Sequence, residues 1–266
     1  MNKKIAIIGG GNLGKSIATG LLHANAVRPE DLTITRRKIQ FLLSFSEQGV
    51  NVTSDNHEAV NESDIVIFSV KPHKINDILL SVKSDILKKK PIVISTVTGV
   101  KLTELASILG NTISLYRAMP NIAISVGESM TCISTNSHDE VQNNTIAGLF
   151  NVMGHSAFID DDLMGAATVL GASGIAFAMR YIRAAMQAGI EIGFSSELSK
   201  QIVTQTVRGA SVLLQENNIH PESEIDKVTT PRGITITGLS KMELHGFSSS
   251  LVQGVLASYE KIKEVK

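Results

Sequence analysis

Short apolar runs alternate with longer, partly polar stretches over about the first 160 residues. Ile5–Ile8 is the first of these runs. Near-continuous apolar runs of this length are typical of parallel strands buried on both faces, and the stretches between them are long enough for helices. The pattern therefore predicts an α/β fold with a doubly wound, mostly parallel sheet. The other strands are expected at Leu32–Thr35, Asp64–Val70, Ile92–Thr96, Ile113–Arg117, 129–135 and 155–159.

The pattern changes at Leu163, after which only helical stretches are expected. In the stretch that begins at Ser195, apolar residues recur at helical spacing and form one face, which we interpret as core or as a subunit interface. We predict a sheet domain over 1–161 and an all-α dimerisation and substrate domain over 162–266. The four helical stretches are expected at about 163–188, from Ser195, from Pro231–Thr235, and from Ser248 to the end.

Composition narrows the class of protein. The formal net charge of the 266 residues is zero. The charged residues are scattered along the chain, which argues against a nucleic-acid or anionic-membrane surface. Cys132 is the only cysteine, so no internal disulfide is possible. The basic start is followed by an apolar run that meets glycine after four residues, and no apolar run approaches the ~20 residues that span a bilayer. We therefore expect no signal peptide, no membrane partner and a cytoplasmic location.

The segment Gly9–Gly14 has the spacing G-x-G-x-x-G and lies between the first strand and a predicted helix. In that setting Gly9 permits a tight turn, Gly11 lets the backbone approach a pyrophosphate, and Gly14 lets helix and strand pack closely. Free N–H groups at the helix start would face the phosphates. A glycine-rich turn alone can be structural, but the flanking strand and helix favour a dinucleotide site and a Rossmann-type domain.

Two arginines follow the second strand. Arg36 and Arg37 stand where an NAD-binding protein carries an Asp or Glu for the ribose hydroxyls. A carboxylate there would repel a 2′-phosphate, whereas guanidinium groups can bind one through charge-assisted hydrogen bonds. A solvated basic strand end is the alternative. With the glycine turn just upstream, the pair favours NADP(H) over NAD(H).

Two other segments could carry chemistry. Val70-Lys71-Pro72 ends a strand, and ligands of doubly wound sheets bind at the carboxyl ends of strands. Thr229–Thr235 is rich in hydroxyls and contains a helix start, whose N–H groups can hold a carboxylate, although a capped interhelical turn fits the spacing equally well. The seven histidines are scattered without a metal-ligand spacing, so we predict no metal.

Several of these pieces, in this order and spacing, resemble the pyrroline-5-carboxylate reductase family over the whole chain. The resemblance implies a Rossmann domain, a helical domain that interlocks two subunits, and assemblies of dimers such as a ring. The pieces are Gly9-x-Gly11-Asn12-Leu13-Gly14, Val70-Lys71-Pro72, Arg117-Ala118-Met119-Pro120-Asn121, Gly127-Glu128 and the stretch from Asp226 to Leu239.

The resemblance also implies site residues. Thr235 would hydrogen-bond the substrate's ring nitrogen as the catalytic residue, and the backbone of Gly233, Ile234 and Thr235 would bind the substrate carboxylate. The substrate site would further include Val228, Thr230, Met119 and Asn121. The cofactor site would comprise Gly9, Gly11, Asn12, Leu13, Gly14, Thr35, Arg36, Arg37, Asn56, Val70, Lys71 and Pro72.

This chain departs from the family pattern at two places. Arg232 stands where the family's Ser-Pro-Gly-Gly-Thr-Thr run has glycine, and it could crowd the loop or place a cation near the carboxylate. The family's Ser-Gly-Pro-Ala-Tyr run is Ser-Gly-Ile-Ala-Phe here, so Ile175 and Phe177 could alter a dimer contact.

The activity implied is NADPH-dependent reduction of 1-pyrroline-5-carboxylate to L-proline, with NADH as a weaker donor. One alternative is a related NADPH-dependent imine or hydroxy-acid reductase. The hydroxy-acid enzymes usually depend on a lysine in the helical domain. The nearest lysine after the small-residue helix here, Lys200, lies outside the segment 171–176, which disfavours a hydroxy-acid reductase. The other alternative is a catalytically impaired regulatory paralogue, which Arg232 keeps open and which Gly233 and Thr235 disfavour.

Overall fold

The computed structural model describes residues 3–264, which form two compact units. The first, here called the sheet unit, runs up to Ser173 and includes the C-terminal stretch from Ser258. The second, the helical unit, comprises Gly174–Ala257.

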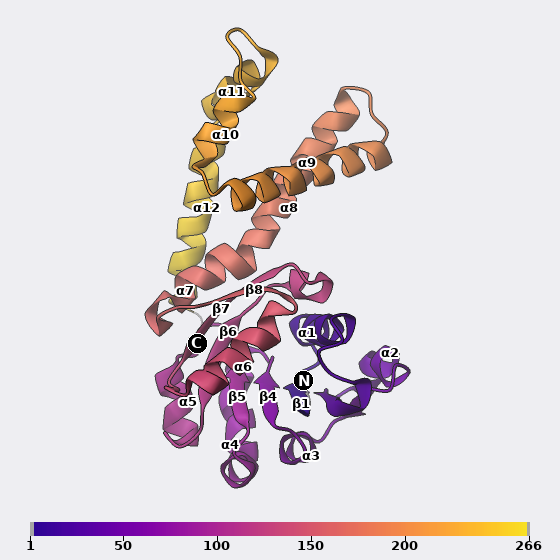
Figure 1. Cartoon of the computed structure of the whole chain (residues 1–266), viewed down its shortest axis with the longest axis vertical. Helices are drawn as coiled ribbons and strands as arrows, with labels where there is room; N and C mark the ends of the chain where they lie inside the picture. The colour runs from indigo at the N-terminus through magenta and orange to yellow at the C-terminus, as the bar shows by residue number, and fades with distance from the viewer. Residues whose placement is uncertain (1–2, 265–266) are drawn as a thin grey trace. The chain divides into compact units, whose positions relative to one another are not determined.

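The sheet unit contains an eight-stranded sheet in the order β3-β2-β1-β4-β5-β6-β7-β8 (Figure 1). All neighbouring strands are parallel except β6 and β7. The chain order reverses at β1, which pairs with β2 on one side and β4 on the other, and ligands of such sheets bind at this switch point. The strands are β1 Ile5–Ile8, β2 Leu32–Thr35, β3 Asn51–Thr53, β4 Ile65–Phe68, β5 Ile92–Ser95, β6 Leu115–Met119, β7 Ser129–Thr135 and β8 Gly154–Phe158.

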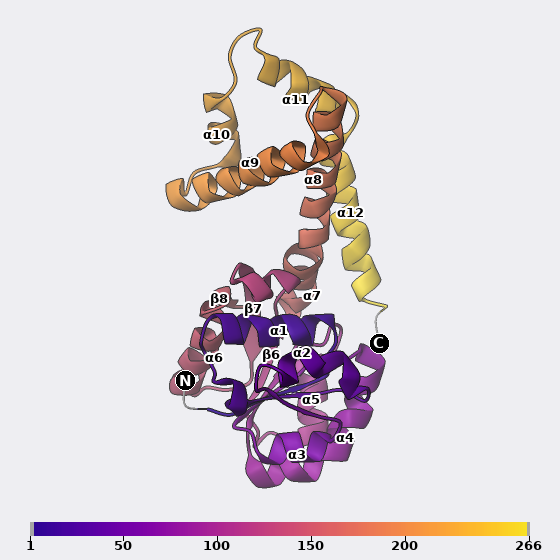
Figure 2. The same cartoon turned by 90° about the vertical axis from the view of Figure 1, so that its right-hand side faces the viewer.

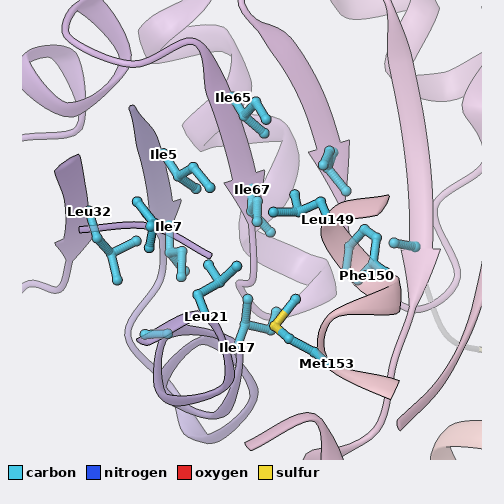
Figure 3. Close-up of a cluster of buried hydrophobic side chains, with 14 of the residues drawn as sticks. Ile5, Ile7, Ile17, Leu21, Leu32, Ile65, Ile67, Leu149, Phe150 and Met153 are labelled. Carbon is cyan, nitrogen blue, oxygen red and sulfur yellow. The ribbon is translucent and has the colours of Figure 1, made fainter. Parts of the chain in front are cut away.

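Helices cover both faces of this sheet, so alternate residues of each central strand enter different cores. Ile5 and Ile7 of β1 pack in the first cluster with α1 and α6 residues such as Ile17 and Phe150 (Figure 3). Ala6 packs in the second cluster with α3, α4 and α5. The helices of this unit before residue 160 are α1 Asn12–His23, α2 Leu43–Ser46, α3 Asn56–Asn61, α4 Pro72–Lys89, α5 Leu102–Leu109 and α6 Glu140–Asn151. Short 3₁₀ turns cover Pro29–Asp31 (η1), Ile39–Leu42 (η2), Ile122–Val126 (η3) and Asp161–Leu163 (η4).

The sheet unit ends with an irregular helical segment. Helix α7 (Met164–Ala167) continues into a π-helical turn, η5 (Thr168–Ser173), which the sequence pattern did not predict. The last turn of α12 (Phe247–Ile262) lies against α7. A Cβ placed on Gly165 would lie 3.5 Å from the Tyr259 ring, an ordinary van der Waals distance, so alanine would also fit at this contact.

The helical unit contains α8 (Gly174–Glu191), α9 (Ser196–Asn217), α10 (Pro221–Lys227), α11 (Ile234–Leu244) and most of α12. Helix α9 crosses α8 (Figure 2), and the two approach closely where Ser199 Oγ donates a hydrogen bond to Met186 O at 2.9 Å. Helix α10 was not predicted from the sequence, because its seven residues include only one large apolar side chain, Ile225, and so carry no helical periodicity.

The expectation that no apolar stretch approaches the length of a bilayer span fails for one helical run. Within residues 3–264, the continuous helical run Asp161–Glu191 is long and apolar enough to cross a membrane, by length and composition alone. Arg180 and Arg183 interrupt its apolar residues, so a search for an uninterrupted apolar run overlooks it. Helices that pack against another protein surface meet the same criterion, because they too present apolar residues on most sides.

Candidate active site

The glycine turn after β1 has the geometry that its spacing predicts. Gly9 has φ +111°, and a Cβ on it would lie 2.4 Å from Ser69 O. A Cβ on Gly14 would lie 2.2 Å from Gly9 O, so this position is also restricted to glycine. At Gly11 a Cβ would meet nothing within 4 Å, which leaves the backbone open to a ligand. No side chain caps the start of α1, so its first N–H groups are available to an anion.

A cavity of about 490 Å³ lies beside this turn, at the carboxyl ends of β1, β2 and β4. Of the residues expected to hold the cofactor, it is lined by Gly9, Gly11, Thr35, Arg36, Arg37, Asn56, Val70 and Lys71. Gly14 and Leu13 pack instead against the turn and the core, and Pro72 is the first residue of α4. Asn12 lines a separate cavity on the outer side of α1.

Seven residues that line the same cavity were not predicted as part of the cofactor site. Four of them have polar side chains, Ser54, Ser69, His73 and Lys74, and the other three are Ile8, Gly10 and Ile78. His73 and Lys74 lie in the first turn of α4. The signal for them was Pro72, which favours the first position of a helix and so places the next two residues beside the strand end. Asp and Glu are absent from the residues that line this cavity, which suits a phosphate-bearing ligand.

Hydrogen bonds fix the polar groups at the end of β2. Thr35 Oγ1 donates to Asn56 Oδ1 at 2.7 Å, which joins β2 to the start of α3. Arg36 Nη1 donates to Gly10 O at 2.8 Å. The same backbone segment binds the glycine turn in return, because Gly9 N and Gly10 N both donate to Thr35 O. The basic end of β2 and the glycine turn therefore form one hydrogen-bonded assembly.

Met119 and Asn121, expected near the reacting ring, lie at the end of β6. The Met119 side chain is buried, while both ends of the Asn121 amide bind protein groups. Its Oδ1 accepts from Ala123 N at 2.9 Å, and its Nδ2 donates to Gly171 O of the π-helical turn at 3.1 Å. In this structure Asn121 joins the end of β6 to η5.

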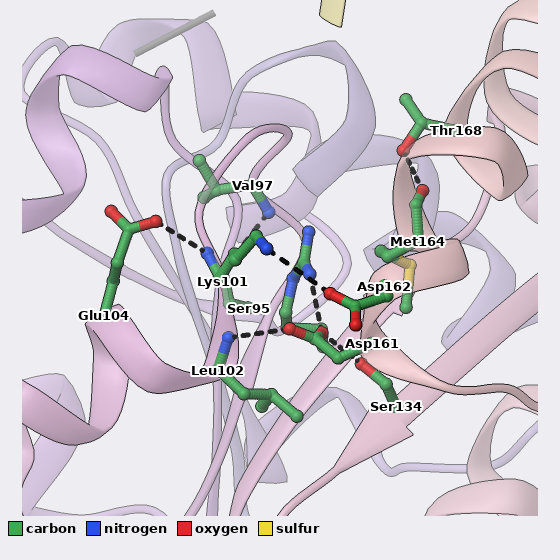
Figure 4. Close-up of polar contacts among 11 residues, drawn as sticks. Ser95, Val97, Lys101, Leu102, Glu104, Ser134, Asp161, Asp162, Met164 and Thr168 are labelled. Carbon is green, nitrogen blue, oxygen red and sulfur yellow. Dashed lines mark hydrogen bonds and ion pairs between the residues drawn. The ribbon is translucent and has the colours of Figure 1, made fainter. Parts of the chain in front are cut away.

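Arg117, from the same motif, is a structural residue. Its guanidinium is buried and its Nη1 lies 2.6 Å from Asp161 Oδ1. Asp161 also accepts hydrogen bonds from Ser134 Oγ at 2.8 Å and Leu102 N at 3.2 Å (Figure 4). Burial raises the pKa of Asp161, but the hydrogen bonds from Ser134 and Arg117 and the charge of Arg117 outweigh it and hold that pKa below its usual value.

The expected substrate residues of the helical unit gather around the start of α11. Gly233 N donates to Thr230 O at 2.8 Å, and a Cβ on Gly233 would lie 2.4 Å from Thr230 Oγ1. No side chain caps α11, so its first N–H groups can receive a carboxylate. The hydroxyl of Thr235 is half-buried and has no hydrogen-bond partner among residues 3–264. Ile234 and Val228 are exposed.

Arg232 adopts φ +60° in this turn. Glycine reaches that left-handed conformation without strain, whereas a residue with a Cβ is disfavoured there. The departure of this chain from the family pattern therefore falls at a position where the backbone itself favours glycine. No group of three or more potential metal ligands occurs in the described part of the chain.

Comparisons with known proteins cover nearly the whole chain. Residues 161–265 match the family model described as pyrroline-5-carboxylate reductase dimerisation, and residues 4–99 match one described as NADP oxidoreductase, coenzyme F420-dependent. Pyrroline-5-carboxylate reductase 1 of Dictyostelium discoideum is 41% identical over 97% of this chain, which spans only 49% of that protein's length. Pyrroline-5-carboxylate reductase 2 of the same organism is 41% identical over 98% of this chain and 92% of that protein.

The fold comparison agrees. The crystal structure of Plasmodium falciparum pyrroline carboxylate reductase with NADP bound has a TM-score of 0.91 and 27% identity, covering 99% of this chain and 98% of that one. Both the N-terminal sheet and the C-terminal helices therefore have counterparts in the same known structure. The chain belongs to the pyrroline-5-carboxylate reductase family.

Proposed function

We propose that the protein catalyses the NADPH-dependent reduction of 1-pyrroline-5-carboxylate to L-proline. The observation that carries the proposal is the cavity that joins the open glycine turn to Arg36 and Arg37 without a lining carboxylate. Two pyrroline-5-carboxylate reductases align with this chain over 97% and 98% of its length. An enzyme of this class is an oxidoreductase that acts on a carbon–nitrogen double bond.

The residues around the cavity fit a dinucleotide phosphate. Gly9 forms a tight turn in which a Cβ would clash with Ser69 O, and Gly11 leaves open space that a side chain would fill. The first N–H groups of α1 would bind the pyrophosphate. Arg36 and Arg37, with Thr35, would bind the 2′-phosphate through charge-assisted hydrogen bonds. Asn56 and Lys71 would line the remaining walls of the site. NADH lacks the 2′-phosphate and is therefore the weaker cofactor.

The start of α11 would hold the substrate. The backbone N–H groups of Gly233, Ile234 and Thr235 would bind its carboxylate, and the free hydroxyl of Thr235 would hydrogen-bond the ring nitrogen. NADPH supplies the hydride that the imine carbon accepts. A cyclic imine is basic enough to be partly protonated near neutral pH, so Thr235 would position the nitrogen and share its proton. Holding both ends of the substrate would fix a near-attack geometry.

The helical unit supports self-association. The family model that matches residues 161–265 is described as a dimerisation region, and the helices of this unit expose apolar side chains such as Ile192 and Leu244. We propose a homodimer that can assemble further into a ring of dimers, with a functional boundary between the two domains at residues 161 and 162. We also propose a cytoplasmic location, and the zero net charge disfavours a surface for nucleic acid or anionic membranes.

The test is the oxidation of NADPH by the purified protein with 1-pyrroline-5-carboxylate, repeated with NADH, with L-proline measured as the product. Proline formation with a preference for NADPH supports the proposal. NADPH binding without turnover would favour a regulatory paralogue, and turnover of only another imine or a hydroxy acid would favour the related reductase. Arg232→Gly would then show whether the departure at that turn is responsible.

A further inference from the structure

Arg36 is held from two sides at the end of β2. Its Nη1 donates to Gly10 O at 2.8 Å, and its guanidinium carbon lies 4.4 Å from the centroid of the Phe41 ring. A cation at this distance from an aromatic face is attracted by the ring quadrupole. The guanidinium has five N–H donors, of which one makes a hydrogen bond within residues 3–264, and its central carbon Cζ lies over the Phe41 ring. Its other donors can therefore still bind a ligand.

Phe41 owes its position to a buried neighbour. It lies in η2, where Leu42 is fully buried against the glycine turn, and a Cβ on Gly10 would lie 2.8 Å from Leu42 Cδ2. This anchoring fixes the short 3₁₀ turn and leaves the Phe41 side chain 51% exposed. A large aromatic side chain that is half-exposed gains little from core packing, and its ring contact within the described chain is with Arg36.

Arg37 differs from Arg36, although both line the cofactor cavity. Within residues 3–264, Arg37 has no hydrogen bond, ion pair or ring contact. Arg36, Arg37 and Lys38 also line an adjoining cavity of about 540 Å³. One of the two guanidinium groups is thus arranged before any ligand binds, whereas the other must be ordered by it. An arginine carries about 2 kcal/mol of rotamer entropy, so ordering in advance favours binding.

We propose that Phe41 is a positioning residue for cofactor selection, which holds the Arg36 guanidinium ready for the 2′-phosphate. This inference rests on the proposed use of NADPH. Phe41 itself touches no reacting atom, and its effect passes through Arg36. The aromatic face matters because an aliphatic side chain of similar size lacks the quadrupole that attracts the cation.

The experiment measures calorimetric binding of two nicotinamide-free probes, adenosine 2′,5′-bisphosphate and adenosine 5′-monophosphate, to the full-length protein. Phe41→Leu should weaken binding of the bisphosphate about 3- to 10-fold and leave the monophosphate unchanged, as expected for one lost cation–π contact. In turnover assays the KM for NADPH should rise in parallel while kcat stays the same. Phe41→Tyr keeps an aromatic face and should remain within about twofold of wild type.

Leu43→Ala is the matched control, because Leu43 is 58% exposed, lies two residues away and lines neither cavity. It should leave the binding of both probes unchanged. Equal weakening of both probes by Phe41→Leu, or no weakening at all, would overturn the role of Phe41. A wild-type protein that does not distinguish the probes would instead overturn the NADPH assignment, and with it this inference. If the wild-type protein prefers the bisphosphate but does not turn over 1-pyrroline-5-carboxylate, the proposed substrate is wrong, and the role of Phe41 is still decided by the binding data.

Discussion

The two units of this chain bury their apolar residues in different ways. Every residue of β1 and β4 is at most 1% exposed, because helices cover both faces of the sheet. In the helical unit, residues 174–257, Ser199 alone is buried. Ile192, Leu244 and Ile234 there are 77%, 75% and 92% exposed. One sequence thus encodes a unit that is closed within the chain and another whose apolar faces are left open.

The difference shows what each unit needs in order to be stable. Burial of apolar surface supplies most of the stabilisation of a folded unit, so the sheet unit can be stable within one subunit. The helical unit meets that requirement when a second copy covers its faces, which agrees with a dimerisation region that spans residues 161–265. The small residues of α7, η5 and α8 suit such a contact, because they allow helices to approach closely.

The largest expected effect is in the sheet core. Ile67→Ala should lower the free energy of unfolding by about 2–5 kcal/mol, since Ile67 is fully buried in β4 and the change leaves a cavity. Ile192→Ala in the helical unit should change it by less than about 0.5 kcal/mol in the dissociated chain. Denaturant unfolding at low protein concentration measures both. Equal losses would show that the two units do not differ as described.

Thr235→Ala tests the helical unit's part in the reaction. It should reduce kcat/KM by about 10- to 1,000-fold, because one positioning and proton-sharing group is lost from the substrate site. NADPH binding should stay nearly unchanged, since the cavity proposed to bind the cofactor belongs to the sheet unit. Steady-state kinetics and direct NADPH titration measure the two effects. A comparable loss of NADPH affinity would contradict the assignment.

Leu213→Arg tests whether the open faces of the helical unit are covered by a second copy. Leu213 is 51% exposed on α9, and a buried cation there should weaken self-association at least about 30-fold, or roughly 2 kcal/mol. Leu80→Arg on α4 of the sheet unit is the matched control, because Leu80 is 59% exposed. Sedimentation velocity over a range of concentrations measures association. An unchanged oligomer in the first variant would place the interface elsewhere.

The smallest effect is a pH dependence of the sheet unit. Because the pKa of Asp161 is lowered in the folded state, this residue contributes stability above its unfolded-state pKa of about 3.9 and loses that contribution as pH falls through the folded-state pKa. The free energy of unfolding of the wild-type protein should therefore exceed that of Asp161→Asn by a margin that shrinks as pH falls below about 5 and on through the folded-state pKa of Asp161. Chemical unfolding at several pH values measures the difference. A constant difference across that range would contradict the ion pair with Arg117.

Much of the sheet unit followed from the sequence because its strands are continuous apolar runs. Strand β2, Leu32–Thr35, was predicted with the observed bounds. Strand β6, Leu115–Met119, was predicted at Ile113–Arg117, two residues early at both ends, because Ile113 extends the apolar pattern into the preceding turn. The cavity beside Gly9 and Arg36 followed from glycine spacing and from strand ends. Sequence alone could not place Phe41 over Arg36, since that contact depends on how η2 packs on Gly10.

The helical unit was less predictable. The expected helix at about 163–188 contains the π-helical turn Thr168–Ser173, where Gly171 O is hydrogen-bonded by Asn121 from fifty residues earlier. A tertiary contact of this kind leaves no local signal in the sequence. The apolar face of α9 was predicted to be core or a subunit interface. Within the chain this face is not core, because Ile202 and Leu213 are 41% and 51% exposed, and the subunit interface stays a prediction.

The hydrogen-bonded assembly of the glycine turn and the end of β2 bears on the engineering of redox cofactor preference. Gly9 N and Gly10 N bind Thr35 O, and Arg36 binds Gly10 O, so the backbone at position 35 supports both phosphate-binding segments. Grafting a β2 loop from an NAD-dependent enzyme would replace that support and disturb the pyrophosphate turn as well. Side-chain replacements at positions 36 and 37 keep the hydrogen bonds from Gly9 N and Gly10 N to Thr35 O and lose only the one from Arg36 Nη1 to Gly10 O, so they are the more conservative route to a protein that uses NADH.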